Sequence, residues 1–298
     1  MPLSDNARGA LFMSASMAGF IVNDALIKFV LADLPLGQAV FLRGMIATAL
    51  IAGLAAAQGV LFSHIARADR GYLALRLVAE IGMTLCYLSA LARMPIANAT
   101  AILQSMPLAV TLAAALVLGE RVGWRRWVAI AAGFAGVLLI VRPGAGMDAS
   151  ALFAVAALGF LVVRDIVTRL FSASLPSTFV AVLTAASITV VSGGLSAFET
   201  WAPVQPWHWA FLVSTSGFLL IGYVFGIMTM RVGDVAFVSP FRYTMMLWAM
   251  LVGYVAFGDV PDTATIAGAA IIVGAGLFTF WREQVAARRL AAQRGLAE

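Results

Sequence analysis

Long apolar segments constrain the fold of this chain more than any other feature. Ten runs of about 20 mostly uncharged residues follow one another with short connections, and a helix needs about that length to cross a bilayer. Backbone groups in lipid must bond within their own segment, and the runs lack the alternating polarity of a barrel, so each run is predicted to be a helix. The predicted spans are residues 9–31, 36–58, 71–92, 95–118, 124–142, 150–171, 177–197, 209–230, 234–257 and 263–281.

The composition excludes a water-soluble domain. Of the 298 residues, 62% are hydrophobic and 11% are charged, whereas soluble domains carry about 25% charged residues. Cys86 is the single cysteine, and His64 and His208 are the only histidines, so the sequence predicts no disulfide, no metal site and no cofactor. No ATP-binding loop of the GxxxxGK[ST] type occurs, which leaves an ion or substrate gradient to drive any transport.

The arginines are distributed unevenly between the two sides that ten spans define. If the N-terminus is inside, the outer side holds only Arg93 and Arg142. The inner loops, span ends and tail hold Arg8, Arg67, Arg70, Arg121, Arg125, Arg126, Arg169, Arg231, Arg282, Arg288, Arg289 and Arg294. Because positive residues favour the cytoplasm, both termini are predicted to be cytoplasmic in a bacterial inner membrane. The net charge of +5 is then explained by the membrane rather than by nucleic-acid binding.

The two halves of the chain resemble each other. A shift of 141 residues places residues 10–35 on residues 151–176 and matches Asp24 with Asp165 and Pro35 with Pro176. The same shift matches Thr48 with Thr189, and Lys28 meets Arg169. Coincidence between two Ala- and Leu-rich segments is the alternative, but a matched intramembrane Asp and a matched turn Pro are harder to obtain by chance. We therefore expect an internal repeat.

The repeat contains an odd number of spans, so its second copy must be inverted in the membrane. The predicted units are residues 1–142, residues 143–282 and a basic cytoplasmic tail at 283–298. Inverted repeats around a midplane site are a common construction of secondary transporters. The predicted fold is thus all-α and membrane-embedded, with ten helices in two inverted five-helix repeats.

The segment LGERVGWRRWVAIAAGFAGVLLI, at 118–140, carries a resemblance to a known family. It is similar to the Gly-Glu pair and Gly-rich final helix of the EamA-type branch of the drug/metabolite transporter superfamily, with Gly119–Glu120 as the pair and Gly136 in the helix. The counterpart in the second half, Gly258–Asp259 with Gly268, is a weaker match. Within that branch the chain is similar to amino-acid exporters of the YddG type. The resemblance implies a central cavity lined by spans 1, 3, 4, 6, 8 and 9, and it identifies no substrate.

Several charged residues fall inside the spans, where an ionised side chain costs about 2.5–3.5 kcal/mol. Three pairs have i, i+4 spacing, which places both groups on one helix face. These pairs are Asp24–Lys28, Arg76–Glu80 and Asp165–Arg169, and Arg164 precedes the last of them. One interpretation is structural neutralisation, with Lys28 and Arg169 reaching an interface. The other is coupling or gating by Asp24, Glu80 or Asp165, in which a carboxylate binds the coupling proton.

Arg43 and Arg242 lack an acidic partner nearby in the sequence. Each needs an anion from another helix or from the substrate, and a guanidinium suits a carboxylate or phosphate. Both are therefore candidate substrate-binding residues, with interhelical ion pairing as the alternative.

Helix breakers mark the fourth and ninth spans, which are repeat partners. Pro107 follows Asn98 and Gln104, and Ser239–Pro240 precedes Arg242 and Tyr243. Proline frees a carbonyl that can face a cavity, so we interpret Asn98, Gln104, Ser239 and Tyr243 as substrate-binding candidates and Pro107 and Pro240 as gating candidates. A simple packing kink is the alternative.

Aromatic residues within spans complete the candidate set. Phe20, Phe160 and Tyr223 are the substrate-binding candidates, with Tyr87 and Phe237 also within spans; packing against a neighbouring helix is the alternative for each.

The favoured function is a secondary transporter, an exporter or facilitator of a small amphipathic metabolite such as an aromatic or other neutral amino acid. A drug, sugar or nucleotide-sugar transporter of the same superfamily is the alternative. No catalytic constellation is evident, so an enzyme is not expected. The expected partners are the substrate and the lipid bilayer, with the chain as a monomer or weak dimer.

Overall fold

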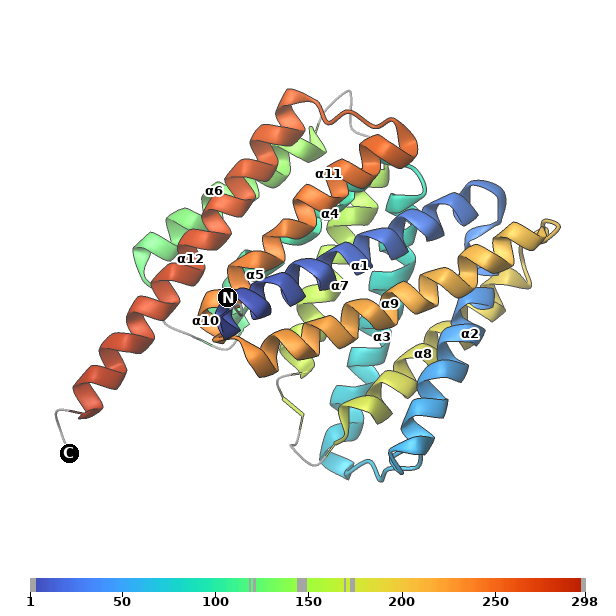
Figure 1. Ribbon diagram of the computed structural model, residues 1–298, viewed down its shortest axis with the longest axis horizontal. Helices are drawn as coiled ribbons and strands as arrows, with labels where there is room; N and C mark the ends of the chain where they lie inside the picture. Colours follow the sequence, from blue (N-terminus) through green and yellow to red (C-terminus); the bar gives the residue numbers. More distant parts are fainter. Residues whose placement is uncertain are drawn as a thin grey trace.

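The computed structural model describes residues 4–117, 119, 122–143, 149–168, 170–171 and 175–295, and all regular structure within them is helical (Figure 1). The elements are α1 (Asp5–Asp33), α2 (Leu36–Ala57), α3 (Arg67–Leu91), α4 (Ile96–Gln104), α5 (Met106–Val117), α6 (Trp124–Val141), α7 (Ala149–Thr168), α8 (Ser177–Ser196), α9 (Pro206–Val232), α10 (Val235–Val238), η1 (Ser239–Tyr243), α11 (Thr244–Phe257) and α12 (Thr263–Gly295). Nine of the described segments are long and apolar enough to cross a membrane, with α4 and α5 taken together. The predicted all-α membrane architecture is confirmed.

Two of the predicted spans are interrupted rather than continuous. The fourth breaks at Ser105, whose hydroxyl donates to the carbonyl of Ile102 at 2.6 Å, and α5 then begins with Pro107 as its second residue. The ninth is divided into α10, η1 and α11, with Pro240 in η1. Proline has no N–H and its ring crowds the preceding turn, which accounts for a break near each of these positions.

Prolines also set where several helices begin. Pro35, Pro95 and Pro176 precede α2, α4 and α8, and Pro206 is the first residue of α9. The first turn of a helix tolerates proline because its N–H groups have no partner within the helix. The last helix, α12, in contrast contains no proline and continues without a break to Gly295. The predicted basic tail is therefore an extension of the last spanning helix over residues 283–295.

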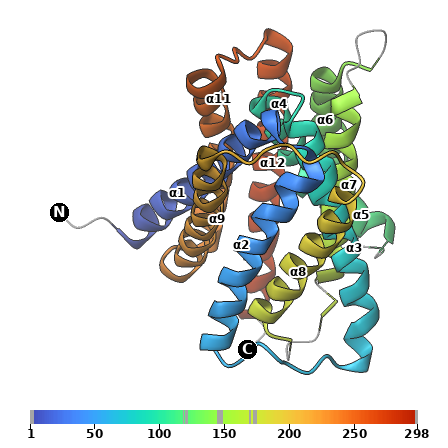
Figure 2. The same ribbon diagram turned by 90° about the vertical axis from the view of Figure 1, so that its right-hand side faces the viewer.

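The main helix packing joins the first half of the chain to the second. Extensive contacts pair α1 with α9, α3 with α7, α2 with α8 and α6 with α12. Figure 1 shows α6 beside α12 at one side of the molecule, and Figure 2 shows α2 beside α8. Each half is therefore incomplete without the other.

The two ends of the bundle differ in how they are closed. We call the end with the start of α1, the start of α6 and the extension of α12 the terminal end, and the end with the α1–α2 and α11–α12 connections the opposite end (Figure 1). The largest buried cluster gathers residues from the helix segments near the opposite end, among them Ile27, Val30, Leu91, Ile96 and Ile140. Close packing of apolar side chains therefore seals the opposite end.

Polar contacts add to this closure. The carboxylate of Glu199, in the α8–α9 connection, accepts from the backbone N–H groups of Gly37 at 2.9 Å and Gln38 at 3.0 Å. The Gln38 side chain exchanges two hydrogen bonds with the backbone of Ala202, at 2.8 and 2.9 Å. The start of α2 is thus fastened to the loop of the other half, because Glu199 satisfies N–H groups that a helix start leaves unpaired.

Candidate functional site

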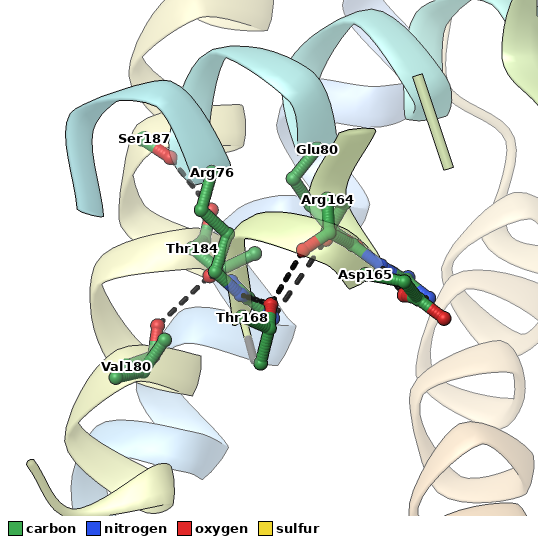
Figure 3. Close-up of polar contacts among 8 residues, drawn as sticks. All are labelled: Arg76, Glu80, Arg164, Asp165, Thr168, Val180, Thr184 and Ser187. Carbon is green, nitrogen blue, oxygen red and sulfur yellow. Dashed lines mark hydrogen bonds and ion pairs between the residues drawn. The ribbon is translucent and has the colours of Figure 1, made fainter. Parts of the chain in front are cut away.

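A cluster of charged side chains lies between α3, α7 and α8. We call Arg76, Glu80, Arg164 and Asp165 the accessible cluster. Arg76 extends from α3 between two hydroxyls, donating to Thr168 at 3.0 Å and to Thr184 at 2.7 Å (Figure 3). Thr184 in turn donates to the carbonyl of Val180 at 2.8 Å. Arg76 is therefore oriented by fixed acceptors on two neighbouring helices.

Two cations flank Glu80 within this cluster. Its carboxylate lies 3.8 Å from Arg76 and 3.5 Å from Arg164, which confirms the predicted i, i+4 pair on α3. The Oε2 atom of Glu80 is buried and accepts no hydrogen bond from the described residues. Glu80 is therefore held between two cations, and its buried Oε2 faces Arg76 at a distance too long for a hydrogen bond.

Asp165 is held by its neighbour. Nε and one terminal nitrogen of Arg164 donate to its Oδ1 at 2.9 and 2.7 Å. The side chains of Arg164 and Asp165 are 23% and 26% exposed, compared with 12% for Glu80. The cluster thus carries two positive and two negative groups, some of which a ligand can reach.

Asp24 lies in a second polar group, in which Asn23 and Asp24 are buried, at 4% and 7% exposure, and the other two side chains are half-buried. We call Asn23, Asp24, Arg43 and Tyr87 the buried cluster. Asp24 accepts from the Tyr87 hydroxyl at 2.5 Å and from the Asn23 amide at 2.9 Å, and Asn23 accepts from Arg43 at 3.1 Å. The amide of Asn23 therefore bridges a cation on α2 to a carboxylate on α1, in the manner expected for buried charges.

The two clusters contain matching contacts. A shift of 141 residues places Asn23 on Arg164 and Asp24 on Asp165. In both pairs the first side chain donates to Oδ1 of the following aspartate, at 2.9 Å in each case. The same local contact therefore occurs on α1 and α7, once buried and once accessible.

Two of the aromatic candidates, Phe20 and Phe160, each pack against a glycine at corresponding positions of the two halves. The Phe20 ring of α1 lies against Gly222 of α9, where an added Cβ would come within 2.8 Å, and the Phe160 ring of α7 lies against Gly82 of α3, where the distance would be 2.7 Å. Phe20 and Phe160 are 140 residues apart, as are Gly82 and Gly222. Phe20 also meets Tyr223 edge-on, with ring centroids 5.5 Å apart.

The interrupted spans meet each other through Gln104. Its side-chain amide donates to the backbone carbonyl of Arg242 at 3.2 Å, so the end of α4 is tied to η1. Arg242 itself is exposed, and Asn98 is half-buried on α4. The Tyr243 hydroxyl packs against Gly276 of α12. Ser239 opens η1 and Pro240 follows it. The sequence predicted that these residues lie together, and the structure connects one of them, Gln104, to η1 by this hydrogen bond.

The predicted Asp24–Lys28 pair is wrong, because each side chain has other partners. Lys28 donates to the carbonyls of Leu91 and Met94 at the end of α3 and lies over the Phe257 ring at 5.3 Å. A cation is favoured beside the free carbonyls of a helix C-terminus, and Asp24 has closer partners. The predicted Asp165–Arg169 pair lies partly outside the described residues, because Arg169 is not described, and neither is Glu120.

Some residues of the site were missed by sequence reasoning. Asn23, Thr168 and Thr184 are ordinary polar residues within apolar runs, and only helix packing brings them to a charge. The available signal was position in the sequence: Asn23 adjoins Asp24, and the 141-residue shift places Arg43 on Thr184. Among the described residues, no group of three His, Cys, Asp or Glu side chains has the geometry of a metal site.

The sequence of this chain is similar to those of known transporters. Residues 7–142 match the model of the EamA-like transporter family. The chain is 30% identical over 272 residues to the pseudopaline exporter CntI of Pseudomonas aeruginosa, covering 89% of this chain and 93% of that one.

Other relatives match over a shorter length. The chain is 28% identical over 195 residues to the S-adenosylmethionine uptake transporter of Rickettsia bellii and 29% identical over 198 residues to the riboflavin transporter of Rhizobium johnstonii, and it spans 66% of the length of each. A solved crystal structure superposes with a TM-score of 0.59 at 24% identity, over 93% of this chain and 98% of that one, and so shares the fold. The chain belongs to the EamA-like transporter family of the drug/metabolite transporter superfamily.

Proposed function

We propose that this protein is a secondary transporter that moves a small amphipathic metabolite across a bacterial inner membrane, as an exporter or facilitator. The observation that carries the proposal is the accessible cluster: two cations and two carboxylates held among apolar spans, with side chains 12–26% exposed. Ionisable groups inside a membrane protein are expensive and usually serve a pathway for substrate or ions. The transporter names of the relatives support the same class.

The charge arrangement favours a zwitterionic substrate, most simply a neutral amino acid or a derivative of one. Arg164 can bind a carboxylate in place of Asp165, and the Glu80 carboxylate can pair with an ammonium group. The rings of Phe160 on α7, Phe20 on α1 and Tyr223 on α9 suit an apolar or aromatic side chain. In this proposal Arg43 and Arg242 bind or guide the substrate carboxylate.

Transport by alternating access follows from the proposed inverted repeat. In this repeat α1, α2, α3 and α6 correspond to α7, α8, α9 and α12. The α1–α9 pair is then equivalent to the α7–α3 pair, and the α2–α8 and α6–α12 pairs are each equivalent to themselves. These are the helix pairs with the most extensive packing. The matched contacts Asn23–Asp24 and Arg164–Asp165 support the same symmetry. In the opposite conformation, the buried cluster would become the accessible one.

The conformation observed corresponds in this proposal to the state open toward the cytoplasm. The packed core and the Glu199 and Gln38 contacts close the opposite end, and the arginine distribution favours a cytoplasmic location for the terminal end. Substrate would then enter from inside and leave when the opposite end opens.

A counterflow assay in proteoliposomes tests the proposal. Vesicles preloaded with an unlabelled amino acid should accumulate the labelled form, and a panel of aromatic and neutral amino acids, S-adenosylmethionine, riboflavin, sugars and nucleotide-sugars identifies the class. Arg164→Gln should abolish exchange, whereas Arg8→Gln, on an exposed side chain at the start of α1, should leave it unchanged. If the protein exchanges none of these compounds, the transport proposal is wrong. If it exchanges sugars alone, the proposal of a zwitterionic substrate is wrong.

A further inference from the structure

A groove of about 480 Å³ lies between α6 and α12 near the terminal end, away from both charged clusters. Its lining consists of Trp124, Arg125, Val128, Ala129, Ala132, Ile271, Ala275, Phe278, Trp281 and Arg282. Ala129 and Ala275 are buried at 5% and 8% exposure, whereas Trp124 and Trp281 are 71% and 56% exposed. Small side chains therefore form the bottom of the groove, and large aromatic side chains form its sides.

The groove exists because the two helices touch elsewhere. Gly136 and Gly268 approach so closely that a Cβ on either would lie within 2.7 Å of the carbonyl of the other. This contact is displaced along the helices from the groove, toward the opposite end. Close glycine contacts fix the crossing of two membrane helices, so the groove beside Ala132 and Ala275 is a stable feature of the pair.

Two guanidinium groups border the groove at the ends of the apolar segments of α6 and α12. Arg125 is the second residue of α6, and Arg282 is the last residue of the apolar part of α12. Arg125 lies 5.4 Å from the centre of the Trp124 ring, and Arg282 lies 6.0 Å from that of Trp281. Trp rings with neighbouring arginines are typical of the interface between hydrocarbon and headgroups. Neither arginine has an acidic partner among the described side chains.

We propose that this groove binds an anionic phospholipid, with an acyl chain between α6 and α12 and the phosphate between Arg125 and Arg282. The charge and the position both fit, because the cations stand at headgroup depth and the apolar lining continues from them into the hydrocarbon. Basic pockets between helices on the cytoplasmic side are suited to anionic headgroups.

A second copy of this chain fits the groove less well. A symmetric dimer places the same patch of both chains face to face, which would bring four guanidinium groups, Arg125 and Arg282 of each copy, into one interface. Like charges in an interface are unfavourable. A lipid phosphate neutralises the same two groups, and its acyl chain needs no complementary protein surface.

Native mass spectrometry of the detergent-purified protein tests this site. The probes are dioleoylphosphatidylglycerol and dioleoylphosphatidylcholine, which share their acyl chains and differ in headgroup charge. We expect the wild-type protein to retain the anionic lipid preferentially, and Arg125→Gln/Arg282→Gln to reduce its binding about tenfold or more, as expected for the loss of two cations near a headgroup. Glycerol 3-phosphate alone should not displace the lipid, because the acyl chain contributes to binding.

Two further variants separate a built site from general attraction. Arg67→Gln/Arg70→Gln removes the same charge from exposed positions at the start of α3 and should leave binding unchanged. Ala132→Phe keeps both arginines but fills the groove, and it should weaken binding. Thermal unfolding verifies that each variant is folded. Equal retention of the two lipids, an equal loss in the α3 variant, or a dimer that Ala132→Phe dissociates would overturn the proposal. None of these outcomes depends on transport activity.

Discussion

Thr48 of α2 and Thr189 of α8 share a hydrogen bond of 3.0 Å between their hydroxyl oxygens, and they are separated by 141 residues, the shift that aligns the two halves of the sequence. A residue can meet its own repeat mate only close to the axis that relates the two copies. The contact therefore supports an approximate twofold axis between α2 and α8, and the proposed inverted repeat with it.

The contact between α2 and α8 should be sensitive to small increases in volume. A Cβ on Gly44 would clash with the Thr189 hydroxyl, whereas Gly53 on the same helix has nothing within 4 Å. Because overpacking costs about 1–3 kcal/mol, Gly44→Ala should lower the unfolding midpoint measured by denaturation in detergent. Gly53→Ala should leave the midpoint unchanged or raise it; equal midpoints for the two variants would contradict the packing described.

The two phenylalanine–glycine contacts should be equally important for transport. Gly82→Ala and Gly222→Ala each force an aromatic ring to move, and a penalty of 1–3 kcal/mol on a transport step corresponds to a rate reduced by about fivefold or more. Gly71→Ala on α3 and Gly217→Ala on α9 have no neighbour within 4 Å and serve as controls in counterflow. A loss in only one of the two test variants would show that the contacts are not equivalent.

Proton coupling through Asp24 or Glu80 predicts a changed pH profile. Asp24→Asn or Glu80→Gln should flatten the dependence of transport on pH, because an amide cannot take up the coupling proton. Transport rates across a pH series, with Asp5→Asn as an exposed control, provide the measurement. A pH profile that both variants share with the wild type would exclude these carboxylates as coupling sites.

Recognition of a substrate carboxylate by Arg43 and Arg242 predicts selective losses. Arg43→Ala and Arg242→Ala should weaken transport of an amino acid more than that of its amide, because a guanidinium pairs with a carboxylate. Competition by each compound against a labelled substrate provides the comparison, with Arg70→Ala as a surface control. Equal losses for acid and amide would assign both arginines structural roles.

Asp262 predicts a pH dependence of stability at the opposite end. Its carboxylate accepts from the backbone N–H of Thr265 at 2.9 Å and from Arg142, so it caps α12 and joins that helix to the end of α6. These contacts, led by the Thr265 hydrogen bond, lower the pKa of Asp262 from 3.8 to about 2. The folded state therefore binds this proton less readily than the unfolded state, and the stabilisation is present above about pH 4 and is lost as pH falls toward 2.

Asp262→Ala should accordingly lower stability near neutral pH by about 1 kcal/mol, as is typical for a lost N-cap. The difference from the wild type should shrink in acid, and unfolding midpoints at neutral and low pH measure it. A difference that persists unchanged at the lowest pH would show that the carboxylate charge does not contribute.

The helices were predictable from the sequence because each depends on a property of its own segment. Bilayer thickness sets the apolar length that a span needs, and prolines such as Pro35 and Pro176 mark helix starts wherever the rest of the chain lies. The Arg76–Glu80 pair was also predictable, since residues four apart share a helix face. The interruptions near Pro107 and Pro240 followed from the chemistry of proline.

The partners of the buried groups were decided by tertiary structure alone. Helix periodicity made Lys28 a possible partner for Asp24, but packing placed Tyr87 and Asn23 closer and left Lys28 beside the carbonyls that end α3. The pairing of Phe20 with Gly222, and of Phe160 with Gly82, likewise depends on which faces of distant helices meet. The physical reason is that a local pattern specifies the face of a helix, whereas contacts across the bundle depend on the packing of all the helices together.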